Sequence, residues 1–129
     1  MAQIRAEMCI EDCGTYLYII LPPYESVAAM QDHIEKIYDA VEKYGNRKIL
    51  VDATATEKQI PIFELYELCI YLVAKFKNTR PKIAVIAHPS AVYPDRFGEN
   101  VVRNRGLDLI RFIDSTDEAM TWLGIKPAQ

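Results

Sequence analysis

The chain repeats one local pattern three times: a short apolar run, a polar or proline-containing loop, and a segment with helical periodicity. The apolar runs span residues 48–52, 82–87 and 107–113. Strands that are connected through helices pair in parallel. Parallel sheets collect their binding sites at the carboxyl ends of the strands. The pattern therefore predicts a fold class and also the edge of the sheet on which a functional site lies.

A β-hairpin is expected ahead of these units. Residues 15–21 are aromatic and β-branched, which favours a strand, and residues 3–10 form a second candidate strand. Residues 11–14 are typical of a hairpin turn, and Pro22-Pro23 ends the second strand because proline has no N–H to donate. We therefore expect a single α/β domain over residues 1–129. Its mixed sheet has about five strands, an antiparallel hairpin followed by parallel strands, with about four helices.

Composition excludes several classes of protein. Of the 129 residues, 50% are hydrophobic and 26% are charged, as in ordinary globular domains. The net charge of -3 gives no electrostatic footprint for nucleic acid. No apolar stretch approaches the roughly 18 residues that cross a bilayer, and the first residues contain no signal-peptide core. We expect a cytoplasmic protein without a membrane span.

Cysteines and glycines give no sign of a metal or cofactor. Cys9, Cys13 and Cys69 form an odd set, which argues against a disulfide framework in a reducing compartment. Cys9 and Cys13 could share a metal ion with His33 or His88, but their spacing is not that of a zinc site. The five glycines are isolated and form no nucleotide-binding loop. We expect neither a metal nor a cofactor.

Three of the expected helices are marked by capping residues or proline. The first covers residues 26–44, with Ser26 as its N-cap and Gly45 just beyond its end. The others are expected over residues 94–105, beginning at a proline, and over residues 116–123.

A further helix, expected over residues 61–77, is apolar around most of its circumference. Its charged residues are Glu64, Glu67, Lys75 and Lys77. They leave a polar stripe too narrow for a helix that packs against a sheet on one side only. Either neighbouring elements of the same chain cover the second face, or this face is a homodimer interface or an apolar ligand groove. In the second case the contributing residues are Phe63, Tyr66, Ile70, Tyr71 and Val73.

Polar side chains gather where the first parallel strand ends. They are Asp52, Thr54, Thr56 and Glu57. Asp95 and Arg96 are expected to approach them from the loop after the second parallel strand, because neighbouring strands end at the same edge. Two interpretations stay open. The group forms a binding crevice, or Asp52 satisfies loop amides while the threonines lie in a turn.

Signals for catalysis are few. The sequence contains no G-x-S-x-G nucleophile elbow. Ser90 and His88 could form a nucleophile–base pair, but they lie two residues apart in a proline-containing loop, and no orienting acid is fixed by spacing. We therefore expect no enzymatic activity, and a small hydrolase or transferase is the lowest-ranked alternative.

Four segments resemble the SpoIIAA-like, or STAS, domain family. They are residues 82–87, 95–98, 103–106 and 112–123. The order of expected elements is also similar to that of this family over nearly the whole chain, and most similar to its small bacterial STAS/SEC14-like members. The resemblance implies a SpoIIAA-like fold.

The best-known members of this family are bacterial anti-sigma-factor antagonists. In them, a strand that ends in Asp precedes a Ser or Thr that a partner kinase phosphorylates. By this resemblance Asp52 matches the acid and Thr54 the phosphoacceptor, with Thr56 as a second candidate. The sequence departs from the pattern because no glycine follows the acceptor, and because the loop before Pro61 is longer.

The residues and the resemblance together predict a non-enzymatic regulatory or protein-binding module that self-associates as a homodimer. The expected contact surface comprises the helix from Pro61 and the strand-end loop around Asp52, Asp95 and Arg96. The alternative is a carrier or sensor of a small apolar or amphipathic ligand. The same apolar helix and the SEC14-like resemblance favour that alternative.

Overall fold

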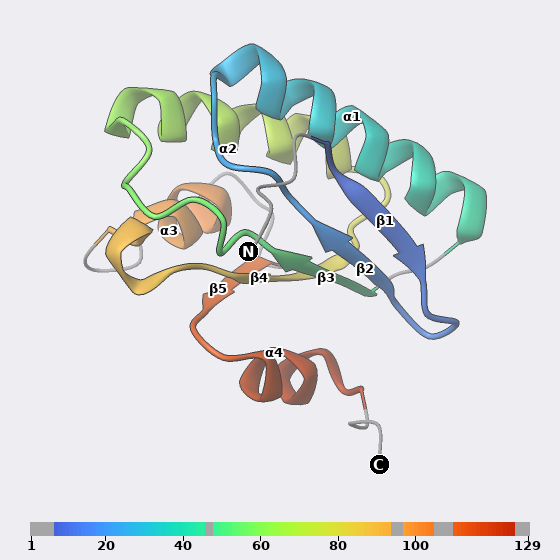
Figure 1. Ribbon diagram of the computed structural model, residues 1–129. Coiled ribbons are helices and arrows are strands. Elements are labelled where there is room, and N and C mark those ends of the chain that lie inside the picture. Colours follow the sequence, from blue (N-terminus) through green and yellow to red (C-terminus); the bar gives the residue numbers. More distant parts are fainter. Residues whose placement is uncertain (1–6, 46–47, 94–96, 105–109, 126–129) are drawn as a thin grey trace.

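A computed structural model describes residues 7–45, 48–93, 97–104 and 110–125 of the chain, and contains a five-stranded sheet in the order β1-β2-β3-β4-β5 (Figure 1). The strands are β1 (Cys9–Asp12), β2 (Leu17–Ile20), β3 (Lys48–Asp52), β4 (Lys82–Ile86) and β5 (Ile110–Ile113). β1 and β2 are antiparallel, and every later pair is parallel. The expected mixed sheet is confirmed.

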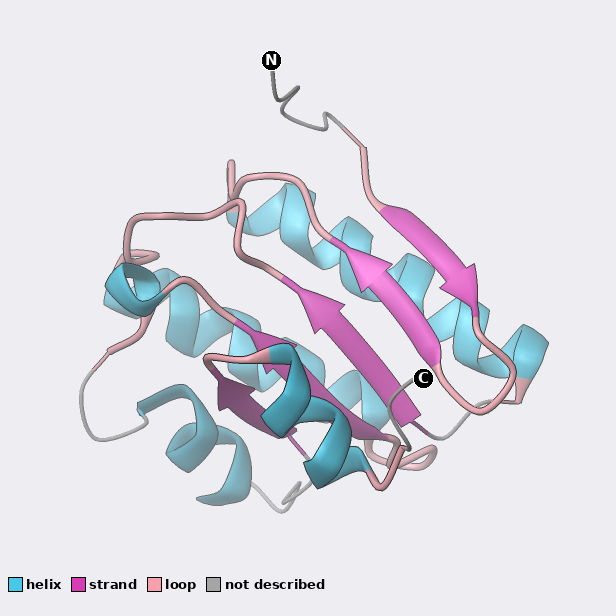
Figure 2. Cartoon of the chain, turned by 60° about the horizontal axis from the view of Figure 1, so that its bottom comes forward, coloured by secondary structure: helices cyan, strands magenta, loops and turns pink. Residues whose placement is uncertain are grey.

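Helices cover the two faces of the sheet unequally. They are α1 (Val27–Tyr44), α2 (Ile62–Phe76), α3 (Phe97–Asn104) and α4 (Thr116–Leu123), with a short 3₁₀ turn η1 (Pro89–Ala91). α1, α2 and α3 lie on one face, and α4 lies on the other (Figure 1). Viewed from the α4 side, no described helix lies in front of β1 and β2 (Figure 2).

The hairpin turn lies further along the chain than residues 11–14. Asp12 pairs with Leu17, and the Cys13 amide donates to the Tyr16 carbonyl over 2.9 Å, which leaves a two-residue loop. Gly14 occupies this loop with φ at 84°, where a residue without Cβ is favoured. The Asp12 carboxylate accepts a hydrogen bond from the Gly14 amide over 3.0 Å. Pairing with β2 thus extends β1 to Asp12, beyond the end at residue 10 that local composition suggests.

Two apolar clusters lie on opposite sides of the sheet. Ile49 and Val51 of β3 face α1–α3, whereas Leu50 between them faces α4 and packs with Leu123. This alternation explains why β3 reads as a continuous apolar run, because both faces of a parallel sheet are covered. Nothing in the described part of the chain has both the length and the hydrophobicity of a membrane-spanning helix.

α1 and α4 begin and end at the residues that the sequence indicates. Ser26 caps α1 by accepting the Ala29 amide over 3.1 Å, and Ser115 caps α4 in the same way. Gly45 and Gly124, at the two C-caps, have φ at 68° and 74°. α3 begins at Phe97, and the outer parts of the helix expected over residues 94–105 lie outside the described residues.

Removing the cap of α1 gives a first prediction. Ser26→Ala should lower the free energy of unfolding by about 1 kcal/mol, because the Ala29 amide loses its acceptor. Urea denaturation monitored by circular dichroism measures this difference. Ser26→Asp keeps an oxygen acceptor and should stay within about 0.5 kcal/mol of the wild type. A loss as large in Ser26→Asp as in Ser26→Ala would contradict the capping role.

Candidate functional site

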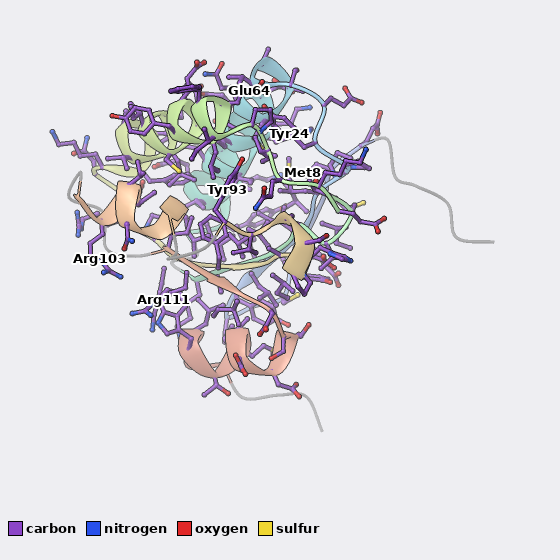
Figure 3. All side chains as sticks on the ribbon, turned by 90° about the vertical axis from the view of Figure 1, so that its left-hand side faces the viewer. Met8, Tyr24, Glu64, Tyr93, Arg103 and Arg111 are labelled. Atoms are coloured by element: carbon purple, nitrogen blue, oxygen red, sulfur yellow. The ribbon has the colours of Figure 1, made fainter. Side chains whose placement is uncertain are left out.

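The carboxyl ends of the parallel strands form one edge of the molecule, seen face-on in Figure 3. Backbone hydrogen bonds continue past the strands there: Leu21 donates to Asp52, and Ala53 donates to Ile86, both over 2.9 Å. The loops that leave β2, β3 and β4 therefore start from fixed positions. This is the edge at which parallel sheets place their binding sites.

Asp52 organises the turn that follows β3. Its Oδ1 accepts hydrogen bonds from the Thr54 amide over 2.9 Å and from Thr54 Oγ1 over 2.6 Å. The hydroxyl of Tyr18 on β2 also interacts with this carboxylate, and burial together with Asp52 raises the pKa of Tyr18. Asp52 thus satisfies a loop amide, as one of the two interpretations has it, while Thr54 lies at the surface.

Thr56 has a different environment from Thr54. Its Oγ1 accepts a hydrogen bond from the Tyr24 amide over 2.9 Å, which joins the loop after β3 to the loop before α1. The Tyr24 hydroxyl in turn donates to Glu64 of α2 over 2.6 Å, and the two side chains lie together in Figure 3. Burial, with Glu64 as the second cause, raises the pKa of Tyr24. Of the two candidate phosphoacceptors, Thr54 is the more accessible.

The structure brings His88 and Ser90 together. Ser90 Oγ lies 2.7 Å from His88 Nδ1, and the Ser90 amide also donates to this nitrogen over 3.2 Å. Glu57 reaches within 4.0 Å of His88 Nε2, and its carbonyl accepts a hydrogen bond from Ser90 Oγ. His88 therefore acts as the N-cap of η1. These contacts with His88 and Glu57 hold Ser90 in the fold of this loop.

Two contacts join the loop before α2 to the segment after η1. Gln59 Nε2 donates to the Val92 carbonyl over 3.3 Å, and the Tyr93 hydroxyl donates to the Ile60 carbonyl over 2.5 Å. Sequence reasoning did not single out Gln59 or Tyr93. Contacts across 33 residues leave no local signal in a sequence.

Large apolar side chains are exposed at the start of α2 and on the segment after η1. We call Ile62, Phe63, Tyr66 and Val92 the strand-end patch. Their exposed fractions are 42%, 86%, 38% and 38%. Phe63 and Tyr66 were among the residues predicted to contribute to an interface or groove. Neighbouring elements of the described chain thus cover much of α2 but leave the outer face of its first turns open.

The remaining predicted residues of α2 are half-buried. Val73 packs against the core that α1 and α2 share, and Ile70 is half-buried as well. The Tyr71 hydroxyl donates to Glu35 of α1, and Lys75 Nζ lies 2.6 Å from the same carboxylate. Lys75, and then Tyr71, lower the pKa of Glu35. We call Glu35, Tyr71 and Lys75 the helix clamp, because they fasten α2 to α1.

Two of the predicted site residues fall in a part of the chain that is not described. Asp95 and Arg96 lie outside the described residues, so their approach to Asp52 stays a prediction.

Within the described ranges, no three His, Cys, Asp or Glu side chains lie close enough together to hold a metal ion. No disulfide joins the three cysteines, all of which are described.

An apolar cavity lies between the sheet and the α1–α3 layer. Its volume is about 160 Å³, and the described elements around it are β3, β4, β5, α1, α2 and α3, with the segments that follow β2 and β3. The sequence left an apolar ligand groove open as an alternative, but none of the five residues named for it lines this cavity.

No protein-family model and no curated protein matches the sequence. Solved structures share its fold, among them the following three. An RsbS variant from Moorella thermoacetica has a TM-score of 0.60 and 12% identity, covering 92% of this chain and 96% of that one. An anti-sigma factor antagonist from Mycobacterium paratuberculosis has a TM-score of 0.54 and 15% identity, covering 92% and 93%. The protein TM1081 has a TM-score of 0.55 and 17% identity, covering 98% and 95%.

These likenesses extend over most of each chain and confirm the expected SpoIIAA-like fold. Because the sequence identities lie between 12% and 17%, these structures show a shared fold but not a shared function.

Proposed function

We propose that this protein is a non-enzymatic regulatory module, built as one SpoIIAA-like domain over residues 1–129, that binds a protein partner at the strand ends. The observation that carries the proposal is the strand-end patch, in which Phe63 is 86% exposed. Leaving such side chains in water forgoes about 25 cal/mol per Å² of apolar area, and exposed apolar groups of this kind mark interaction sites. A fold shared with RsbS and an anti-sigma factor antagonist supports a regulatory role.

The proposal includes self-association through the same patch. A homodimer that pairs two copies of α2 would cover Phe63 and Tyr66 at once, because a two-fold interface uses the same residues of both subunits. Aromatic side chains are the residues that most often dominate the energy of such interfaces.

Sedimentation velocity over a range of protein concentrations tests self-association. Tyr66→Ser should weaken the dimer at least about tenfold, and Phe63→Ser should weaken it further. Tyr44→Ser is a matched control, since Tyr44 has a similar exposed fraction, 44% against 38% for Tyr66, but lies at the far end of α1. A strict monomer at millimolar concentration would exclude self-association. Equal effects of Tyr66→Ser and Tyr44→Ser would exclude the patch as its interface.

Thr54 is the proposed regulatory position in this surface. A phosphate on Thr54 would remove the hydroxyl proton that Asp52 accepts and would add a charge of about -2 beside that carboxylate. Like charges at this distance repel, so modification should open the turn after β3 and alter the binding edge.

Phosphopeptide mass spectrometry of protein purified from its own cells tests the choice of acceptor. We expect modification at Thr54 and not at Thr56, whose hydroxyl holds the Tyr24 amide. In partner binding, Thr54→Glu should then reproduce the modified state, and Thr54→Val, which lacks both the hydroxyl and the charge, serves as its control. Phosphate on Thr56 alone would contradict this assignment.

A further inference from the structure

The cavity between the sheet and the α1–α3 layer is too large to be an ordinary packing gap. Protein interiors are packed as densely as organic crystals, and they contain few voids larger than a water molecule. This one leaves about 160 Å³ unfilled and is partly open to the surface, although its walls include large side chains such as Ile49, Leu68 and Phe76. It resembles in size an engineered cavity of about 150 Å³, lined by Leu, Ile and Phe, that stays dry and binds benzene or xenon.

Contacts at both ends of α2 fix the position of this helix relative to its neighbours. Near its start, Glu64 accepts the Tyr24 hydroxyl over 2.6 Å, and the preceding Ile60 carbonyl accepts the Tyr93 hydroxyl. Towards its end, the helix clamp fastens it to α1, with Lys75 also lying 4.5 Å from the centre of the Tyr38 ring. The cost of a cavity depends on how far its walls can collapse, and here these contacts oppose collapse.

The chemistry of the walls defines the occupant. Every described side chain that lines the cavity is apolar, apart from the thiol of Cys69. A charged or strongly polar ligand would lose its hydration there without gaining a hydrogen-bond partner, which is costly. The apolar lining therefore favours neutral ligands over charged ones, including fatty acids with an ionised carboxylate.

We propose that this cavity is a binding site for a small, neutral, apolar molecule, with a single ring or a short alkyl chain held between β3–β5 and α2. The ligand fills the space that the fixed helix leaves, and its affinity comes from dispersion contacts and from the removal of apolar surface from water. The site is separate from the strand-end patch, because α2 lines the cavity with its inner face and carries Phe63 and Tyr66 on its outer face. The inference does not depend on the proposed protein binding.

Thermal unfolding of the full chain with benzene and indole as neutral probes tests the proposal, with benzoate and a long-chain fatty acid as charged counterparts. At about 100 times its Kd, a neutral probe should raise Tm by roughly 10 °C. Methyl NMR spectra should show shifts at Ile83 and Leu68, which line the cavity. Benzoate should bind at least about tenfold more weakly than benzene.

Cavity-filling variants establish where the probes bind. Val85→Phe adds bulk from β4, and Cys69→Leu adds bulk from α2, so that one variant remains informative if the other does not fold. Each folded variant should bind benzene at least about tenfold more weakly, whereas Tyr66→Ser, on the outer face of α2, should leave binding within twofold of the wild type. The proposal is overturned if no neutral probe binds, if only the charged probes bind, or if both filled variants bind benzene as well as the wild type does.

Discussion

Phe76→Ala is expected to lower the free energy of unfolding by about 3–5 kcal/mol, the largest loss that we predict for a single substitution. Phe76 is 1% exposed, and its ring centre lies 5.7 Å from that of Tyr38 in a tilted arrangement. It also lines the apolar cavity, so truncation enlarges an existing void instead of opening a small one that neighbours can fill. Small domains are stable by about 5–15 kcal/mol in total. Urea denaturation measures the change.

Phe63→Ala is the matched control, because it removes the same ring from the same helix. Phe63 is 86% exposed, so its loss should change the stability of the monomer by no more than about 0.5 kcal/mol. Alanine is also the better helix former, which offsets part of any lost contact. Equal losses in the two variants would mean that the core described around Phe76 is wrong. A loss in Phe63→Ala that grows with protein concentration would instead indicate that a second copy covers this ring.

Most of the secondary structure could be predicted because its signals are local. β3 and β4 fall on the predicted apolar runs, since a strand buried on both faces carries no polar residue within it. Ser26 and Gly45 mark the ends of α1 because their cap geometry depends only on neighbouring residues. The hairpin turn was misplaced, because its register depends on pairing with β2 rather than on the composition of the turn.

The candidate site could be predicted only in part. Asp52 and Thr54 follow a strand, and their mutual hydrogen bonds are local, so position in the sequence was enough to find them. The approach of Glu57 to His88 and Ser90 is a contact between two loops, and no spacing encodes it. For the same reason the sequence left open which residues of α2 point outward. Tyr71 is held by Glu35 on another helix, whereas Phe63 is 86% exposed.

The position and the volume of the cavity could not be predicted, although an apolar ligand site on α2 was one of the alternatives. Its volume is the difference between the space enclosed by two layers and the summed volume of the side chains in it. The first quantity depends on contacts such as those of Tyr24 with Glu64 and of Tyr93 with Ile60, which span 40 and 33 residues. A list of apolar residues predicts a core but not the distance at which its two layers are held. An apolar helix is therefore compatible with a filled core, an interface or a ligand site until the distance between the helix layer and the sheet is known.

Raising the pH is expected to destabilise the protein through Cys69. The thiol is 6% exposed, and burial raises its pKa from the ordinary value of 9.0 to about 11. Because the folded state holds this proton more tightly, the unfolded state loses it first as the pH rises. The contribution of the protonated Cys69 thiol to the free energy of unfolding is therefore fully present below pH 9, and it is lost as the pH rises to about 11. A pKa difference of about two corresponds to about 2.7 kcal/mol at most.

The same titration isolates Cys69 when the wild type is compared with Cys69→Val. Tyrosines and lysines also ionise in this range, but they do so in both proteins, so the difference in unfolding free energy between the two reports the thiol alone. We expect this difference to be constant below pH 9 and to shift by about 2–3 kcal/mol in favour of Cys69→Val by pH 11. Urea denaturation at pH 8 and at pH 11 measures it. A difference that does not change with pH would mean that water reaches the thiol in the folded state, and the burial of Cys69 on the inner face of α2 would then be wrong.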